Sequence, residues 1–364
     1  MTTWATETID STGDVGSYCA LVVDSSRIPH ALCYDATAGN LNYYVRSAAP
    51  PAAGTWAKTV VASDGDVGRH AALAIDSSGT LHAICYDVTN QNVLYFSKAS
   101  GGAWSAPTTI EGSIGWYANQ SFRIKINPAT GYPAALFLGA IKDRYAEYNG
   151  ASWDIVDIGG ITDGKYHDFC FEANGDVHLT QDASGGLNNR YYQRTSGVWG
   201  AASLVGVSGE FQNLILFTTG QPWMAVNEAM IKLSVGKYAD GAWDGFTDID
   251  TASEAGDYIS MDMGGDSLPA IAYQINDEKL WFAKWNAASW DTEVVQDVDN
   301  AVGSYLSLSM QDEYSRARIA YYDLTAADFL FAYDSAADPH PPHPWTASGL
   351  GMCGHGKVRH ALGV

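Results

Sequence analysis

Seven short segments of this chain each contain a glycine, a variable residue and then an aromatic residue or histidine. These residue types could bind a ligand or transfer protons. We call the segments triplets: Gly16-Ser17-Tyr18, Gly68-Arg69-His70, Gly115-Trp116-Tyr117, Gly164-Lys165-Tyr166, Gly209-Glu210-Phe211, Gly256-Asp257-Tyr258 and Gly303-Ser304-Tyr305. The middle residue changes in size and charge from copy to copy. This variation predicts a surface specialised segment by segment. The alternative is that the middle residues are ordinary solvated loop tips.

Charge is distributed unevenly over the triplets. Copies two to four are aromatic and basic, whereas copies five and six contribute acids. Aromatic rings stack on the apolar face of a sugar, and cations hold carboxylate or sulfate groups. We therefore predict a binding surface for carbohydrate or another surface ligand, composed of Arg69, His70, Trp116, Tyr117, Lys165, Tyr166, Glu210 and Asp257. Trp116→Ala is expected to abolish glycan binding with little change in melting temperature.

Seven tryptophans give the register of the elements that must position the triplets. They recur every 44 to 52 residues, at Trp4, Trp56, Trp104, Trp153, Trp199, Trp243 and Trp290. Between tryptophans lie a doubly apolar run opened by the triplet, a second apolar run such as 31–35, an aromatic run such as 41–44, and a more polar run that begins at the tryptophan. This pattern predicts four short antiparallel strands repeated seven times, and thus an all-β, seven-bladed β-propeller.

The chain ends predict how the ring closes. The segment 4–10 matches the outer-strand pattern of 290–297 yet precedes the first inner strand, so we expect it to complete the last blade and remove a free edge. Trp345 competes for that place, but its surroundings are rich in proline, which cannot donate to a ladder. We therefore expect a propeller over 1–334 and an irregular Pro-, His- and Gly-rich tail over 335–364 that docks on a partner or on the ring.

Composition excludes some classes of partner. The chain of 364 residues carries 20 Lys plus Arg against 41 Asp plus Glu, a net charge of -21. So acidic a chain argues against nucleic acid and anionic membranes as partners. Its N-terminus lacks the basic and apolar regions of a signal peptide, and no run approaches the roughly 20 apolar residues that span a bilayer. These features leave the compartment open, with an extracellular or virion-associated place as the working hypothesis.

The repeat resembles the sialidase-like, or BNR-type, propellers. The resemblance rests on the Gly-x-Tyr opening, the Asp76-Ser77-Ser78-Gly79 type of turn, the Tyr34-Asp35 type of strand end and the later tryptophan, and it covers residues 1 to about 334. Phe122-Arg123-Ile124 is similar to the start of the sialidase arginine motif, but Lys125 stands where proline is expected. No copy contains the full Asp-box order, so the resemblance implies the fold and leaves sialidase activity without support.

A lyase is the enzymatic alternative. Some BNR-type propellers are polysaccharide lyases that act on uronate-containing glycans, and the resemblance implies the roles that such chemistry needs. His70 would be the base, Tyr117 or Tyr166 the acid, and Arg69 or Lys165 the group that neutralises the carboxylate. The His-Asn pairing of those lyases is replaced here by His70-Ala71. The sequence therefore favours a non-catalytic recognition propeller, and a structural part of a virion or extracellular assembly is a further alternative.

Metal ligands are predicted at two places, although no cofactor is required by the pattern. The tail holds His340, His343, Cys353, His355 and His360, which are soft or imidazole ligands suited to zinc or copper, although their spacing matches no established site. Loops entering the inner strands carry carboxylates that would suit calcium: Asp10, Asp14, Asp64, Asp66, Asp248, Asp250, Glu254, Asp297 and Asp299. The five cysteines are expected to be free thiols.

Overall fold

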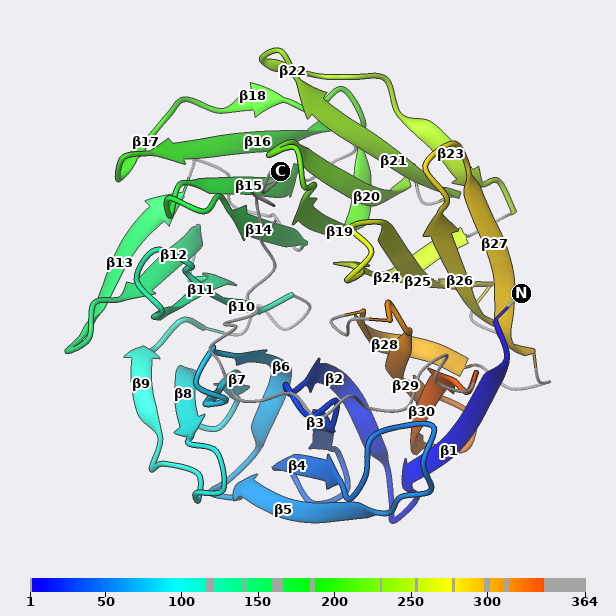
Figure 1. Cartoon of the computed structure of the whole chain (residues 1–364). Helices are drawn as coiled ribbons and strands as arrows, with labels where there is room; N and C mark the ends of the chain where they lie inside the picture. The colour runs from blue at the N-terminus through cyan, green and yellow to red at the C-terminus, as the bar shows by residue number, and fades with distance from the viewer. Residues whose placement is uncertain are drawn as a thin grey trace, which may run out of the picture.

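The computed structural model describes residues 2–336 except 116–120, 140–141, 159–165, 184–186, 230, 253–254, 277–278, 298–301 and 311–313. Within this part the strands form seven antiparallel sheets that stand as blades around a central axis (Figure 1). The prediction of an all-β, seven-bladed propeller is confirmed. The predicted tail falls almost entirely on 337–364, which lie outside the described residues.

The first three blades each contain four strands. Blade 1 is β2 (Val15–Val23), β3 (Pro29–Asp35), β4 (Asn40–Arg46) and β5 (Trp56–Ala62). Blade 2 is β6 (Val67–Ile75), β7 (Leu81–Asp87), β8 (Asn92–Lys98) and β9 (Thr108–Glu111). Blade 3 is β10 (Arg123–Ile126), β11 (Pro133–Leu138), β12 (Asp143–Tyr148) and β13 (Trp153–Ile158).

In blades 4 and 5 the outer strand is split into two short pieces. Blade 4 is β14 (His167–Phe171), β15 (Val177–Ala183), β16 (Leu187–Thr195), β17 (Val198–Trp199) and β18 (Ser203–Leu204). Blade 5 is β19 (Gly209–Leu216), β20 (Pro222–Glu228), β21 (Lys232–Ala239), β22 (Ala242–Trp243) and β23 (Thr247–Asp250). Blade 6 is β24 (Ala255–Met263), β25 (Pro269–Ile275), β26 (Lys279–Trp285) and β27 (Trp290–Asp297).

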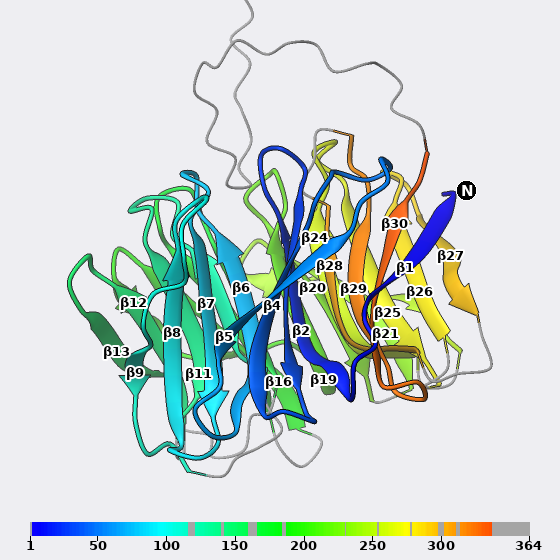
Figure 2. The same ribbon diagram turned by 90° about the horizontal axis from the view of Figure 1, so that it is seen from below.

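Blade 7 is completed by the N-terminus, as predicted. It contains β28 (Val302–Ser309), β29 (Arg318–Asp323), β30 (Asp328–Asp334) and β1 (Trp4–Asp10). Strand β1 pairs with β30 from Trp4 opposite Asp334 to Asp10 opposite Phe329, and the two strands lie side by side in both views (Figures 1 and 2). This pairing joins the two ends of the ring and covers the edge that β30 would otherwise expose.

The seven tryptophans bind each blade to its predecessor. Each packs its ring edge against an aromatic ring of the preceding blade, with centroid separations from 5.1 Å for Trp153 on Tyr95 to 6.5 Å for Trp290 on Trp223. The other five pairs are Trp56 with Phe331, Trp104 with Tyr43, Trp199 with Tyr145, Trp243 with Tyr191, and Trp4 with Phe282. The tryptophans thus hold neighbouring blades to each other.

The core lies between blades, which explains why the inner strands are apolar on both alternations. One cluster, for example, joins Leu32 and Leu41 of blade 1 to Leu73, Ala83 and Cys85 of blade 2. The four cysteines within the described residues are buried and free, as expected for small core hydrophobes.

Glycine at the start of the triplet is required by this packing. A Cβ on Gly68 would lie 2.9 Å from the Cα of Leu41 in the preceding blade, and one on Gly16 would lie 2.9 Å from the Cα of Phe329. Both glycines also have φ near +120°, which favours glycine over residues with a side chain. The register shifts around the triplet, so a bulge turns its third residue toward the axis.

Strands account for all the regular secondary structure in the described part of the chain, and no helix long and apolar enough to cross a membrane occurs there.

Candidate functional site

The third residues of the triplets meet at the axis as a collar of rings. Tyr18 lies 4.5 Å, centroid to centroid, from both His70 and Tyr305. Further round the ring the neighbouring pairs are Tyr305 with Tyr258 at 4.9 Å, Tyr258 with Phe211 at 4.9 Å, and Phe211 with Tyr166 at 4.3 Å. These contacts join adjacent blades, so the rings form a continuous arc around the axis from His70 to Tyr166.

Several collar residues are held in an unusual backbone conformation. Tyr18, His70, Phe211, Tyr258 and Tyr305 all have φ between 48° and 55°, in the left-handed region. A residue with a large side chain occupies this region at a cost, and such strain is often found where a side chain must be aimed at a ligand. The repeated conformation therefore indicates that the bulge serves to direct rings toward the axis.

A cavity of about 320 Å³ opens at the collar. Its lining includes the collar rings, Ser121, Phe122 and Arg123. Arg123 is the one Lys or Arg among the described lining residues, and its side chain is about one quarter exposed. A volume of this size suits a small ligand such as a sugar of one or two rings. A second cavity of about 340 Å³ lies further along the channel and shares Phe122 and Arg123 with the first.

The collar tyrosines remain protonated at neutral pH. Burial raises the pKa of Tyr305 to about 12, and burial likewise raises the pKa of Tyr18 and of Tyr166 above the ordinary value. Neutral phenols can donate and accept hydrogen bonds, which suits contact with the hydroxyl groups of a sugar.

The middle residues of the five triplets that the structure describes in full lie outside the lining of the collar cavity. Ser17 and Ser304 are buried, so neither is a solvated loop tip. Arg69 donates to Asp66 at 2.9 Å and lies over the ring of Tyr34. Glu210 and Asp257 also lie outside the cavity lining. Of the five residues predicted to bind that the structure describes, His70 and Tyr166 line the cavity.

The third copy departs from the predicted register. Strand β10 begins at Arg123, and Ile126 pairs with Pro133 as Val23 pairs with Pro29 in blade 1. Counting back along the strand puts Ser121 in the position of Tyr18. Phe122 follows it and packs on His70 at 5.5 Å. Trp116, Tyr117 and Lys165 lie outside the described residues, as do the tail ligands His340, His343, Cys353, His355 and His360, so their predicted roles stay predictions.

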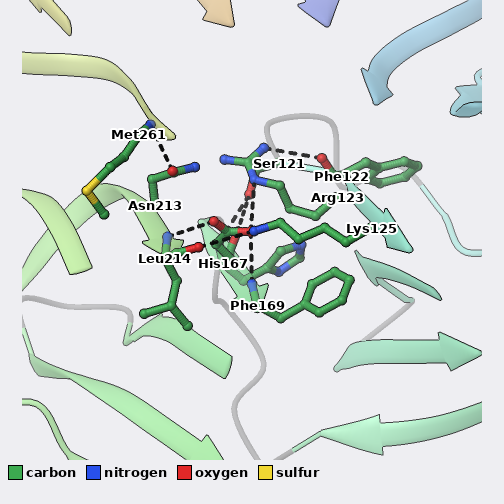
Figure 3. A network of polar contacts seen from close by, with 10 residues as sticks. Ser121, Phe122, Arg123, Lys125, His167, Phe169, Asn213, Leu214 and Met261 are labelled. Atoms are coloured by element: carbon green, nitrogen blue, oxygen red, sulfur yellow. Dashed lines mark hydrogen bonds and ion pairs between the residues drawn. The ribbon is translucent and has the colours of Figure 1, made fainter. Parts of the chain in front are cut away.

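The channel wall beyond the collar carries a charge network that the sequence did not reveal. Asp168 is fully buried; its carboxylate lies 2.9 Å from the ammonium of Lys125 and 3.5 Å from the guanidinium of Arg123 (Figure 3). The same carboxylate accepts the backbone N–H of Leu214 at 2.7 Å. It thus joins blades 3, 4 and 5 at the channel wall and holds two cations toward the channel.

Similar hydrogen bonds link later blades around the wall. Asn213 accepts from the N–H of Met261 at 2.8 Å, and Ser260 accepts from the N–H of Leu308 at 3.0 Å. These acceptors, with Ser307, all stand two residues after the triplet aromatic, where blades 1 and 2 have Ala20 and Ala72. The signal was present in the sequence as a polar residue at one fixed offset. It could be read only once strand pairing showed that this offset faces the channel.

Six of the nine acidic loop residues proposed for calcium have protein partners among the described residues. Asp10 accepts from Tyr44 and Lys58, and Asp14 accepts from Tyr322. No three His, Cys, Asp or Glu side chains come together as a metal site among the residues that are placed. Glu254 and Asp299 lie outside them, and the prediction of calcium in these loops stays untested.

Sequence comparisons found no protein family that matches this chain and no curated protein with significant similarity. Solved structures, in contrast, match over most of its length. The BP39L lectin of Burkholderia pseudomallei is 12% identical, with a TM-score of 0.70 over 89% of this chain and 97% of the lectin.

Two further likenesses span different activities. The fucose-specific lectin of Aleuria aurantia is 14% identical, with a TM-score of 0.51 over 80% of this chain and 98% of the lectin. The Trypanosoma rangeli sialidase is 9% identical, with a TM-score of 0.54 over 88% of this chain and 55% of the sialidase. At such identities the likeness shows the fold, and the chain shares the propeller fold of lectins and of a sialidase.

Proposed function

We propose that this protein is a carbohydrate-binding propeller whose ligand enters the collar cavity. The observation that carries the proposal is the collar itself: contiguous aromatic rings, with three tyrosines held protonated, around a cavity of about 320 Å³. Rings would stack on the apolar face of a sugar while phenol groups bond to its hydroxyls. Two of the similar structures are lectins, which supports this class of ligand.

Arg123 gives the cavity a preference for a sugar that bears an acidic substituent. Its guanidinium lies beside Asp168, yet that carboxylate is also matched by Lys125. Arg123 can therefore bind a second anion without leaving Asp168 uncompensated. Arginine binds carboxylates and sulfates through paired donors, which adds both strength and orientation. On a chain with net charge -21, such a local cation favours acidic sugars at this point against the overall field.

The lyase alternative has less support from the geometry. His70 lines the cavity, but Arg69 is engaged with Asp66 and lies outside its lining. The raised pKa of the collar tyrosines also makes them weak proton donors. A role in a virion or extracellular assembly rests on the tail, which lies outside the described residues. An absorbance assay for unsaturated uronate products on acidic polysaccharides tests the lyase directly.

Glycan-array and calorimetric measurements test the binding proposal. Tyr258→Ser removes one collar ring and introduces the residue that blade 3 already has at the equivalent position, so the fold is expected to tolerate it. We expect loss of binding to every glycan ligand of the wild-type protein. Arg123→Met is expected to weaken binding to acidic glycans by about tenfold or more, as expected for loss of a charge-assisted contact, while neutral glycans are little affected.

Tyr132→Ala is the matched control. Tyr132 is 41% exposed in blade 3, packs on Tyr148 and belongs to the lining of neither cavity. Its removal should leave glycan binding unchanged. Wild-type affinity in folded Tyr258→Ser would show that the collar is not the binding site.

A further inference from the structure

Neighbouring blades are fastened near the channel mouth by a repeated polar contact, which we call the clasp. The clasp joins the second strand of one blade to the triplet or entry loop of the next. Tyr34 donates to Asp66 at 2.7 Å, Tyr322 to Asp14 at 2.7 Å, and Asn227 to Asp257 at 2.6 Å. Tyr86 donates to the carbonyl of Gly115, and Gln274 donates to Ser304 and to the carbonyl of Val302. Each of these five clasps therefore pairs a donor with an acceptor.

The clasp between blades 4 and 5 breaks this rule. Thr180 of blade 4 pairs with Asp168, and Leu32 of blade 1 pairs with Ala20, so Thr180 and Leu32 are equivalent. Two residues further along each strand, Asp182 is therefore equivalent to Tyr34. Glu210 stands where blade 6 has Asp257, because Glu210 is opposite Asn227 as Asp257 is opposite Gln274. Two carboxylates thus occupy the positions that hold a donor and an acceptor elsewhere. Asp182 is buried, and its described contact is with the backbone N–H of Tyr166 at 2.9 Å.

Buried polar atoms without a partner among the described residues surround these carboxylates. Gln212 follows Phe211 as Cys19 follows Tyr18. Cys19 points its sulfur at the carbonyl of Ala320 in the preceding blade, and Thr180 is the blade 4 equivalent of Ala320. Gln212 therefore faces Thr180. Both side chains are fully buried, and within the described part of the chain neither the amide of Gln212 nor the hydroxyl of Thr180 has a hydrogen-bond partner. Such unmade bonds are costly unless something else supplies them.

We propose that a calcium ion binds between blades 4 and 5, held by Asp182 and Glu210, with Thr180 and Gln212 supplying neutral oxygen ligands. A mixed set of carboxylate, amide and hydroxyl oxygens is what calcium accepts. The ion supplies the positive partner that the donor side chain provides in the other clasps. The ion would join blades 4 and 5 at the one described clasp in which both positions are acids, next to Tyr166 of the collar.

The burial of the two acids supports the assignment. Asp182 is buried and Glu210 is half-buried, so two like charges at this interface would repel each other unless a cation lies between them.

Calorimetric titration of the EDTA-treated full chain with calcium chloride tests the proposal, with thermal unfolding as a second readout. Wild-type protein is expected to bind calcium and to melt at a higher temperature when it is present. Asp182→Asn and Glu210→Gln should each lose one calcium equivalent or about tenfold or more in affinity, because each removes one of two charged ligands. In EDTA, Asp182→Asn should melt above wild type, since the introduced amide can donate to Glu210 as Asn227 does to Asp257.

Asp257→Asn is the matched control, because it removes a carboxylate from the same position of the next clasp. It should leave the stoichiometry unchanged, which separates this site from the other acidic loops. If Asp182→Asn fails to fold, Glu210→Gln carries the test, since Glu210 is half-buried. If wild type and Glu210→Gln bind calcium with equal stoichiometry and affinity, the proposal is overturned. A protein whose melting temperature is raised by glycans but not by calcium would also overturn it.

Discussion

The interface between blades 1 and 2 and the interface between blades 4 and 5 share one register but are built from opposite kinds of side chain. Leu32, Leu41 and Ala71 meet in the first, and their equivalents in the second are Thr180, Asn189 and Gln212. Both interfaces carry the same outer contact of tryptophan on tyrosine, at 5.3 Å and 5.6 Å. The ring is thus held by a uniform outer contact, which leaves its inner contacts free to differ where a ligand is needed.

The largest loss of stability is expected when a polar residue of the interface between blades 4 and 5 is introduced into the apolar interface between blades 1 and 2. Leu41→Asn gives blade 1 the residue that blade 4 has at the equivalent position. Leu41 is fully buried, so the change removes packing and buries an unpaired amide, at a cost of about 4 kcal/mol. Urea unfolding measures this loss. An effect below about 1 kcal/mol would mean that the inner contact contributes little to stability.

A smaller loss should be equal in the two regions. Trp104→Ala and Trp243→Ala each remove a half-buried tryptophan from the outer contact, at about 3 kcal/mol, near the lower end for a truncated aromatic residue. Chemical unfolding of the two variants gives the comparison. If Trp243→Ala were far milder than Trp104→Ala, the outer contact would not be uniform, and the split outer strand of blade 5 would explain the difference.

The reverse substitution should stabilise the polar interface when calcium is absent. Gln212→Leu replaces a buried amide that has no partner among the described residues with the residue that blade 7 has at this position, Leu306, and should gain about 1 kcal/mol. Gln274→Leu is the control, because the buried amide of Gln274 donates to Val302 and Ser304. That variant should lose stability. A loss of similar size in Gln212→Leu would show that its amide has partners in solution.

The smallest effect is a change in pH dependence. Because the folded state raises the pKa of Asp182 to about 7, this carboxyl favours folding fully below about pH 4, its unfolded pKa, and the contribution is lost as the pH rises through 7. Asp182→Asn should remove that component, so the difference in urea midpoint between variant and wild type in EDTA should change between about pH 4 and 8. If the urea midpoints of variant and wild type instead run parallel over this pH range, Asp182 has its ordinary pKa in the folded protein.

Periodic features of the chain were predictable because they repeat in every copy. Seven tryptophans and seven glycines indicated the blade number, the order of strands and the closure by β1, and each has a local physical reason. The glycine is needed where Gly68 touches Leu41, and the tryptophan where Trp104 meets Tyr43. The candidate site was predicted in part: His70 and Tyr166 line the cavity, whereas Arg69 was assigned to binding and instead contacts Asp66.

Residues at other offsets could not be assigned without the pairing of strands. Arg123, Asp168 and Gln212 belong to three different blades, and nothing in their sequence spacing shows that they face the channel or a neighbour. In the third copy the strand pairing places Ser121 at the position of Tyr18, which the sequence could not show because strand register decides the face on which each side chain lies.

The sequence by itself determined the ring, because it contains seven copies of a four-stranded unit and places the outer strand of the last copy at the N-terminus, where pairing closes the circle. Only the tertiary structure decided which residues meet. The triplet bulge turns the third residue to the axis, so these rings form the collar, whereas the middle residues Asp257 and Ser304 join clasps to the preceding blade. Adjacent positions in a strand point to opposite faces, and this separation cannot be read until the strand has partners.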